Sequence, residues 1–335
     1  MKIIVTGGLG FIGSNFILSC LQKNNIEILN YDAVTYASDF TNVSSVSNNK
    51  RYQFVEGNIC DSAKLSSVMS AFKPDAIINF AAESHVDNSI TGPSAFIQTN
   101  VVGTQVLLAE SLTYWKNIKS TKMKNFRFFH ISTDEVYGSL EPEDPAFTEL
   151  TRYDPSSPYS ASKAASDHLV NAYHRTFGLP VLLSNCSNNY GPRQHDEKFI
   201  PTVINRMVHR QKIPVYGNGL QVRDWLHVSD HCDAIWAILK NGEVGEMFNI
   251  GGNAALKNLD VIEHIAYSMQ QLKGGCQSSD YLDLIEHVDD RLGHDKRYAI
   301  NSEKLQNHLK WSPIKSFSSG ILSTVEWYLK FKYSV

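Results

Sequence analysis

Short apolar runs alternate with amphipathic stretches through the first 187 residues of the chain. The apolar runs are rich in β-branched and aromatic residues, which is typical of buried strands, and the stretches between them place apolar residues at helical spacing. We predict strands at 2–6, 27–31, 52–55, 76–80, 126–131 and 181–184, and helices at about 11–21, 61–72, 93–116 and 159–177. This alternation predicts an α/β fold with a Rossmann-type, doubly wound parallel sheet and right-handed crossovers, in which strand 181–184 closes the sheet.

The pattern changes after residue 187. Shorter strands are predicted at 213–216, 247–250 and 285–288, and helices near 198–210, 229–240, 258–272 and 317–331. Between the two parts, residues 139–158 contain four prolines and form a connecting loop. We expect one domain at 1–187, with contributions from about 222–245, and a smaller, partly interleaved C-terminal domain at 188–335.

Composition places the chain among ordinary globular proteins, with 335 residues, 42% hydrophobic and 19% charged. The formal net charge of −3 gives no reason to expect a nucleic-acid or membrane partner. An anionic ligand therefore needs local basic groups, and a diphosphate clamp is one use for Lys198, Arg223, Arg291 and Arg297, although each is also a common kind of surface charge.

Targeting and redox signals are few. No apolar segment approaches the roughly 20 residues that span a bilayer, and the first strand leads directly into a glycine loop without room for a signal peptide. The five cysteines are scattered and form no CxxC pair, which favours free structural thiols over a disulfide framework or a metal site. We expect a cytoplasmic protein without a bound metal.

A glycine loop follows the first strand. Gly7, Gly10 and Gly13 let the backbone turn sharply into a helix whose N-terminus suits a pyrophosphate. Asp32 ends the second strand, 19 residues after Gly13, where a carboxylate accepts hydrogen bonds from a ribose diol and repels a 2′-phosphate. The pattern favours NAD over NADP, the alternative for Asp32 being an ordinary turn residue.

A polar strip follows strand 126–131, in which Thr133 precedes the adjacent carboxylates of Asp134 and Glu135. The carboxyl end of a strand in an open parallel sheet is where ligands bind. Tyr159 and Lys163, four residues apart, share one face of the next helix. Small residues also follow the fourth strand, where residues 81–85 (AAESH) would let a cofactor cross the sheet edge. Glu83 and His85 there are alternatively loop polar groups with no role.

These residues resemble the extended short-chain dehydrogenase/reductase superfamily, through residues 6–13 (TGGLGFIG) and 159–163 (YSASK). More narrowly, the chain is similar to the dTDP-glucose 4,6-dehydratases over nearly its whole length. The matching stretches are 32–37 (DAVTYA), 81–87 (AAESHVD), 132–138 (STDEVYG), 188–192 (NNYGP), 221–228 (QVRDWLHV), 293–295 (GHD) and 297–300 (RYAI). Three positions depart from the usual pattern: Asn58 for aspartate, Asn88 for arginine and Leu292 for proline.

The resemblance implies specific contacts. Those to NAD, beyond the loop glycines, are Phe11, Ile12, Asp32, Thr35, Asn58, Ile59, Ala81, Ala82, Ser84, Thr99, Tyr159, Lys163 and Asn189. Those to the sugar nucleotide are Ser84, Thr133, Asn188, Lys198, Phe199, Pro214, Tyr216, Arg223, Asn258, Arg291 and His294. It also implies a homodimer formed through helices near 95–116 and 159–177.

The resemblance further implies dehydration of a nucleoside-diphosphate glucose to its 4-keto-6-deoxy product. Tyr159, its pKa lowered by Lys163 and the cationic nicotinamide, would take the O4 proton with help from Thr133. Glu135 would then take the C5 proton, and Asp134 would protonate the departing O6. Because adjacent buried carboxylates repel each other, one of them is expected to keep its proton.

Other functions stay open at this point. UDP-glucose is the main alternative to dTDP-glucose as substrate. A 4-epimerase or decarboxylase would use Tyr159 and Lys163 without needing the carboxylate pair, so Asp134 and Glu135 favour dehydration. A catalytically silent NAD-binding protein would be expected to have lost one of these residues.

Overall fold

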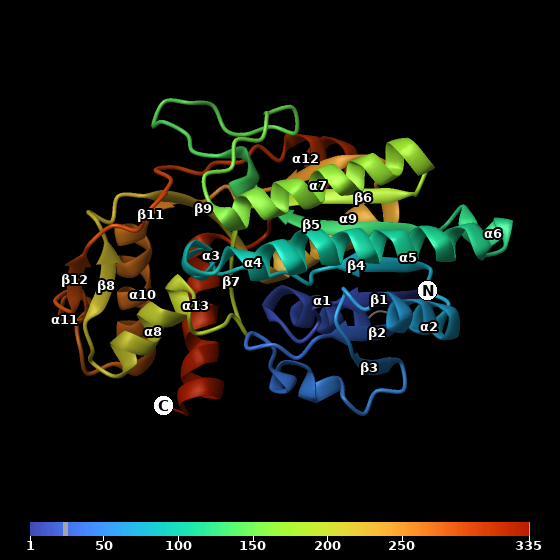
Figure 1. Ribbon diagram of the computed structural model, residues 1–335. Coiled ribbons are helices and arrows are strands. Elements are labelled where there is room, and N and C mark those ends of the chain that lie inside the picture. Colours follow the sequence, from blue (N-terminus) through green and yellow to red (C-terminus); the bar gives the residue numbers. More distant parts are fainter. Residues whose placement is uncertain (23–25, 335) are drawn as a thin grey trace.

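The computed structural model describes residues 1–22 and 26–334, and its centre is a seven-stranded parallel sheet (Figure 1). The strand order is β10-β6-β5-β4-β1-β2-β3, and every neighbouring pair is parallel. The strands are β1 (Lys2–Thr6), β2 (Glu27–Asp32), β3 (Tyr52–Glu56), β4 (Ala76–Asn79), β5 (Arg127–Thr133), β6 (Val181–Cys186) and β10 (Met247–Ile250). The predicted Rossmann-type sheet is confirmed.

One expectation about this sheet is wrong. Strand β6 does not close it, because β10 pairs with β6 in parallel, with Met247 opposite Leu183 and Ile250 opposite Cys186. The chain thus leaves the sheet after β6, builds part of the smaller lobe, and returns to add a seventh strand. The returning segment, through β10, reaches just past the expected 222–245.

Helices cover both faces of the sheet because successive strand residues point to opposite sides. On β1, Ile3 and Val5 join one buried cluster and Ile4 joins another. The first face is covered by α1 (Phe11–Leu21), α9 (Val228–Asn241), α12 (Glu303–Leu309) and the 3-10 helix η1 (Phe40–Val46). The second is covered by α2 (Ser62–Phe72), α5 (Thr104–Asn117) and α7 (Pro158–Phe177).

Three short helical segments precede α5, the first two separated by Gly92. They are α3 (Val86–Thr91), α4 (Pro93–Phe96) and the π-helix η2 (Ile97–Gly103), all of which contact α7, and the short α6 (Ser120–Met123) follows α5. The predicted helix 93–116 therefore exists, with a π-helical section at its start.

A smaller lobe packs beside the carboxyl ends of the strands and has its own buried cluster. It contains β7 (Asn188–Tyr190), β8 (Ile213–Tyr216), β9 (Val222–His227), β11 (Ala255–Lys257), β12 (Ile285–Val288), α8 (Phe199–Val208), α10 (Asn258–Lys273), α11 (Ser278–Leu282), α13 (Phe317–Tyr328) and the π-helix η4 (Leu329–Tyr333). In Figure 1, α8, α10, α13 and the β8–β12 pair form one side of the molecule and the large sheet the other. Within the described residues, no helix is both long and apolar enough to cross a membrane.

Candidate active site

The glycine loop joins β1 to α1 in a very tight turn. A Cβ on Gly13 would lie 2.4 Å from the Gly7 carbonyl oxygen and 2.9 Å from the Gly8 Cα, so a side chain there has no room. Gly7 adopts a φ of +69°, which favours glycine. Helix α1 starts without a side-chain cap at Gly10, so its first N–H groups are suited to an anionic ligand.

Asp32 lies buried at the carboxyl end of β2 and organises the loop around it. Its Oδ2 accepts a 2.9 Å hydrogen bond from the Leu9 N–H. Its Oδ1 accepts from the Val34 N–H at 2.9 Å and from the Ser38 hydroxyl at 2.7 Å. Since Oδ2 has one protein donor, it retains capacity for a ribose hydroxyl.

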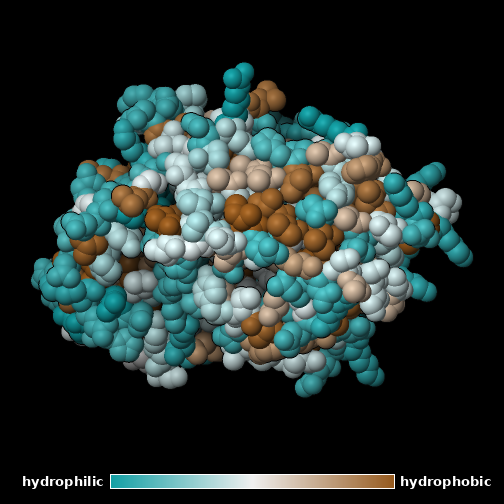
Figure 2. All heavy atoms as spheres, in the orientation of Figure 1, coloured by the Kyte–Doolittle hydropathy of each residue, from teal (hydrophilic) through white to brown (hydrophobic). Residues whose placement is uncertain are grey.

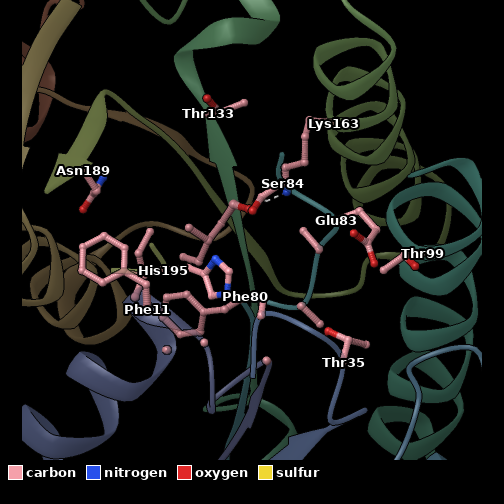
Figure 3. A pocket seen from close by; sticks show the side chains of 18 of the residues that line it. Phe11, Thr35, Phe80, Glu83, Ser84, Thr99, Thr133, Lys163, Asn189 and His195 are labelled. Carbon is pink, nitrogen blue, oxygen red and sulfur yellow. Dashed lines mark hydrogen bonds between the residues drawn. The ribbon is translucent and has the colours of Figure 1, made fainter. Parts of the chain in front are cut away.

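A cavity of about 320 Å³ runs along the carboxyl ends of the strands from this loop to the end of β5. Figure 3 shows side chains from both lobes around it, with Thr35 near one end and Thr133 at the other. The structure brings every predicted cofactor residue to its wall: Gly7, Gly10, Phe11, Ile12, Gly13, Asp32, Thr35, Asn58, Ile59, Ala81, Ala82, Ser84, Thr99, Tyr159, Lys163 and Asn189. The predicted catalytic residues line the same cavity, which joins the two sets in one site.

The polar strip leaves β5 through a 3-10 helix, η3 (Asp134–Tyr137). The Thr133 hydroxyl accepts from the Glu135 N–H at 3.3 Å and lies 3.4 Å from Asp134 Oδ1. The Tyr137 hydroxyl donates to Asn249 Oδ1 at 2.8 Å, which fixes the far end of the turn. The tight turn places both carboxylates at the cavity.

The two carboxyls differ in their electrostatic surroundings. Burial, reinforced by the charge of Glu135, raises the pKa of Asp134 well above its usual value, and the buried Asp134 Oδ2 finds no hydrogen-bond partner in the part of the chain that the structure describes. Burial also raises the pKa of Glu135, but the charges of Arg291, Arg223 and Lys198 oppose that rise. Asp134 is therefore the better proton donor and Glu135 the better base, the order expected for an acid–base pair.

Tyr159 and Lys163 lie one turn apart on α7, which begins with Pro158 and a capping box between Ser157 and Ser160. Burial, with Glu135 and Cys186 adding to it, raises the pKa of Tyr159 well above its usual value, and only a hydrogen bond with Thr133 opposes this among the main influences. The Lys163 ammonium donates to the Ile131 carbonyl at 2.7 Å.

The expected lowering of the Tyr159 pKa by Lys163 is therefore not met by the protein's own groups. Burial dominates because both side chains are nearly inaccessible to water. Burial also lowers the pKa of Lys163, while the nearby charge of Asp167 raises it.

The charges of three basic groups from the smaller lobe lower the pKa of Glu135 against the effect of burial. Lys198 donates to the Ser84 carbonyl at 2.7 Å. The buried Arg223 guanidinium lies 4.2 Å from the Tyr298 ring centroid and donates to the Asp295 carbonyl at 2.9 Å. Arg291 Nη1 lies 3.5 Å from Asp87 Oδ1.

The remaining predicted substrate residues are less uniformly placed. Asn188 lines the cavity, as Ser84, Thr133 and Lys198 do, whereas Phe199, Pro214, Tyr216, Arg223, Asn258, Arg291 and His294 lie outside its lining in the smaller lobe. Several of these share carboxylate partners. Tyr216 donates to Asp87 Oδ2 at 3.2 Å, and His294 Nδ1 lies 2.6 Å from Asp290 Oδ1. Asn258 donates to Gln221 Oε1 at 3.4 Å, and Gln221 in turn bonds Asp290.

Arg297 does not join the basic group, so that part of the diphosphate-clamp hypothesis is wrong. Its guanidinium donates to the carbonyls of Glu141 and Asp144, at 3.2 and 2.8 Å, and ties down the proline-rich connecting loop. His85 is also outside the cavity lining, and its Nδ1 accepts from the Asn88 N–H at the start of α3. Glu83, by contrast, lines the cavity.

Several residues at or behind the site had not been singled out in the sequence. His195 and Glu197 line the cavity, and the His195 ring lies 5.8 Å from that of Tyr36 across the two lobes. Asp224 is buried and accepts from the Gly252 and Ala254 N–H groups, at 2.7 and 2.6 Å. Asp167 had a readable signal in its position, because it continues the four-residue spacing of Tyr159 and Lys163.

Comparison with known proteins gives consistent matches. A family model described as GDP-mannose 4,6 dehydratase matches residues 4–324. A dTDP-glucose 4,6-dehydratase of Xanthomonas campestris pv. campestris (strain B100) is 52% identical over 326 residues, which cover 97% of this chain and 92% of that protein.

Two crystal structures match over almost the whole chain. The dTDP-glucose 4,6-dehydratase of Bacillus anthracis in complex with NAD has a TM-score of 0.87 and 43% identity, and the match covers 99% of this chain and 98% of that one. DesIV, the dTDP-glucose 4,6-dehydratase of Streptomyces venezuelae with NAD and dTDP bound, has a TM-score of 0.90 and 39% identity, with 100% and 98% covered.

Proposed function

Because the chain belongs to the GDP-mannose 4,6-dehydratase family, we propose that it catalyses the NAD-dependent conversion of dTDP-glucose to its 4-keto-6-deoxy product, with loss of water. The observation that carries the proposal is the position of Asp134 and Glu135. They share one cavity with the glycine loop, Tyr159 and Lys163, and their pKa values order them as acid and base.

The cavity wall fits NAD. The tight turn at Gly13 and the uncapped start of α1 suit the pyrophosphate, and the free capacity of Asp32 Oδ2 suits a ribose hydroxyl. Thr35, Asn58, Ile59 and Ala81 continue the wall from there, and Ser84, Thr99 and Asn189 follow toward Tyr159. When bound, NAD supplies the hydride acceptor at C4 and the hydride that returns at C6.

Tyr159 is the proposed base for the O4 proton, with Thr133 as its hydrogen-bond partner. Its burial is costly for a phenolate, so positive charge must accumulate beside it before the proton leaves. The Lys163 ammonium, one turn away, is the protein's source of that charge. Its hydrogen bond to Ile131 holds the ammonium at the end of β5.

Glu135 is the proposed base at C5, because a neighbouring carbonyl acidifies that carbon. Burial raises the pKa of Glu135, and the three basic residues of the smaller lobe oppose that rise, which favours the ionised form. Asp134 is the proposed acid at O6, because burial and the charge of Glu135 raise its pKa well above the usual value and so favour its protonated form. The proton of Asp134 leaves with the O6 hydroxyl as water. This step separates the reaction from C4 epimerisation.

The smaller lobe supplies the proposed diphosphate and nucleoside contacts. Lys198, Arg223 and Arg291 bring positive charge to the side of the cavity that faces Glu135. Tyr216, Asn258 and His294 lie beyond them, next to Asp87, Gln221 and Asp290. We assign the nucleotide and its base to this region, with Phe199 and Pro214 as its apolar neighbours.

We further propose that the enzyme works as a homodimer in the cytoplasm. Figure 2 shows apolar residues gathered over the α5 and α7 region, and the exposed side chains there include Ile97, Val102 and Phe177. A contiguous apolar surface of this kind favours association. The five cysteines all lie in the described part of the chain and none of them forms a disulfide, which suits a reducing compartment. Light scattering of Ile97→Glu with Val102→Glu tests the dimer, and an unchanged mass would contradict it.

One assay tests the proposed activity. The purified protein is incubated separately with dTDP-glucose and UDP-glucose, and the mass of the sugar nucleotide is followed. We expect loss of one water, faster with dTDP-glucose. Retained mass with conversion to the galacto isomer would replace dehydration by epimerisation, and no turnover of either compound would contradict the proposed activity.

A further inference from the structure

Asp167 lies behind Lys163, one turn further along α7, and is fully buried. Its Oδ2 accepts a 2.8 Å hydrogen bond from the Ser132 hydroxyl and a 3.0 Å hydrogen bond from the Tyr153 hydroxyl. These donors come from β5 and from the connecting loop. Two hydrogen bonds from separate elements hold the carboxylate in one orientation without neutralising its charge.

The tautomer of His130 indicates which atom faces Oδ1, the other carboxylate oxygen of Asp167. Asn79 Oδ1 accepts from the Thr6 hydroxyl at 2.6 Å, so the Asn79 amide nitrogen donates to His130 Nδ1 at 3.1 Å. The His130 proton is then on Nε2, which lies 3.5 Å from Asp167 Oδ1. Burial and the charge of Lys163 hold the pKa of His130 well below its usual value, so this imidazole is neutral.

The Lys163 ammonium lies 3.5 Å from the same His130 Nε2. Lys163 and Asp167 therefore approach one nitrogen from the same helix, and Asp167 Oδ1 has no hydrogen-bond partner among the described residues. Building on the proposed function, we propose that Asp167 is a positioning residue, the buried counter-charge that keeps Lys163 protonated and so able to stabilise the Tyr159 phenolate. Asp167 itself is not among the residues that line the cavity.

The electrostatics of the pair agree with this geometry. Burial raises the pKa of Asp167 to about 6, while the charge of Lys163 and the hydrogen bonds from Ser132 and Tyr153 oppose the rise. Asp167 is thus ionised at neutral pH, when it raises the pKa of Lys163 against the effect of burial. The groups facing Asp167 are His130 and Ser132 from β5, Asn185 from β6, Tyr137 from η3, Tyr153 from the loop and Lys163 from α7.

The decisive variant is Asp167→Asn, which keeps the size of the side chain and removes its charge. Lys163 should then lose its proton at lower pH, so the alkaline limb of the pH profile of kcat should move down by about one unit or more. Oxidation at C4 should slow by at least about tenfold near neutral pH. With substrate deuterated at C4, the isotope effect on kcat should rise above that of the wild type. Asp167→Glu, which restores the charge, should bring the alkaline limb and the rate of C4 oxidation part of the way back to the wild-type values.

Tyr153→Phe is the matched control, since it removes one hydrogen bond to Asp167 and leaves the charge. This variant should raise the pKa of Asp167 and so move the acid limb of the pH profile to higher pH. The alkaline limb and the isotope effect should stay unchanged. If Asp167→Asn folds and shows an unchanged alkaline limb and isotope effect, or if Tyr153→Phe matches it in both, Asp167 is merely structural and the proposal fails. An inactive wild type would instead contradict the proposed function.

Discussion

The Lys198 ammonium donates a 2.7 Å hydrogen bond to the carbonyl of Ser84, linking the start of α8 in the smaller lobe to the loop after β4. Ser84 lines the cavity near Thr133, and the charge of Lys198 lowers the pKa of Glu135. A single side chain therefore joins the two lobes and biases the proposed base toward its ionised form.

We predict that Lys198→Met weakens substrate binding. We also expect Glu135 to take up its proton, and so to stop acting as a base, at a higher pH than in the wild type. Burial raises the pKa of Glu135, and without Lys198 the charges of Arg223 and Arg291 are left to oppose this effect. The pKa of Glu135 should therefore rise, and the acid limb of the pH profile of kcat should move to higher pH. KM should rise by about tenfold, the value of one charge-assisted contact. The exposed Lys212, just after α8, provides the control, and Lys212→Met should leave both quantities unchanged. An acid limb that stays in place would contradict the link to Glu135.

Glu135→Gln and Asp134→Asn should both bind NAD like the wild type and both lose release of water, by about 10²-fold or more. They should differ at C5. In deuterium oxide, substrate recovered from Asp134→Asn should gain deuterium at C5, because Glu135 still removes that proton. Substrate recovered from Glu135→Gln should not gain deuterium at C5. Full activity in either variant, or the opposite labelling, would show that the roles are wrongly assigned.

Much of this site was predictable because its residues occupy the ends of regular elements. Apolar runs predicted the positions of the strands, and the carboxyl ends of parallel strands converge on one edge, which is why Asp32, Ala81 and Thr133 could be placed together before the structure was known. Helical spacing likewise placed Tyr159 and Lys163 on one face of α7. The local sequence is sufficient to place a side chain when its position follows from the residue spacing of a helix or from the end of a strand.

Features set by long-range packing were not predictable in this way. The four residues of β10 read as an isolated short strand, and only the return of the chain through α9 places them beside β6. Arg297 is a basic residue like Arg291 in the sequence, but the connecting loop supplies it with carbonyl partners. The direction of the Tyr159 pKa depends on how completely the two lobes bury it.

Asp134 should also make stability depend on pH. Its folded-state pKa is raised, so the native state binds a proton that the unfolded chain has already released above about pH 4. Stability is therefore lost as pH rises from there toward the folded-state pKa. Asp134→Asn removes this loss, and its melting temperature should exceed that of the wild type at pH 8 and approach it near pH 4. Thermal unfolding of both proteins across that range measures the difference, and parallel curves would contradict the raised pKa.

Gly10 and Gly13 belong to the same glycine loop, but the space around them differs. A Cβ on Gly13 would contact backbone atoms at 2.4 and 2.9 Å, which no side-chain movement relieves, so Gly13→Ala should destabilise the fold by about 1–3 kcal/mol. A Cβ on Gly10 would come no closer than 3.4 Å to the Gly7 carbonyl oxygen, and its φ of −75° suits any residue.

Gly10→Ala should therefore fold with nearly wild-type stability. Because Gly10 lines the cavity, the added methyl group should instead weaken NAD binding. Urea unfolding and calorimetric titration with NAD, applied to both variants, distinguish the effects. Equal loss of stability in the two variants would show that both glycines serve the turn, and unchanged NAD affinity in Gly10→Ala would place the cofactor further from the start of α1 than we propose.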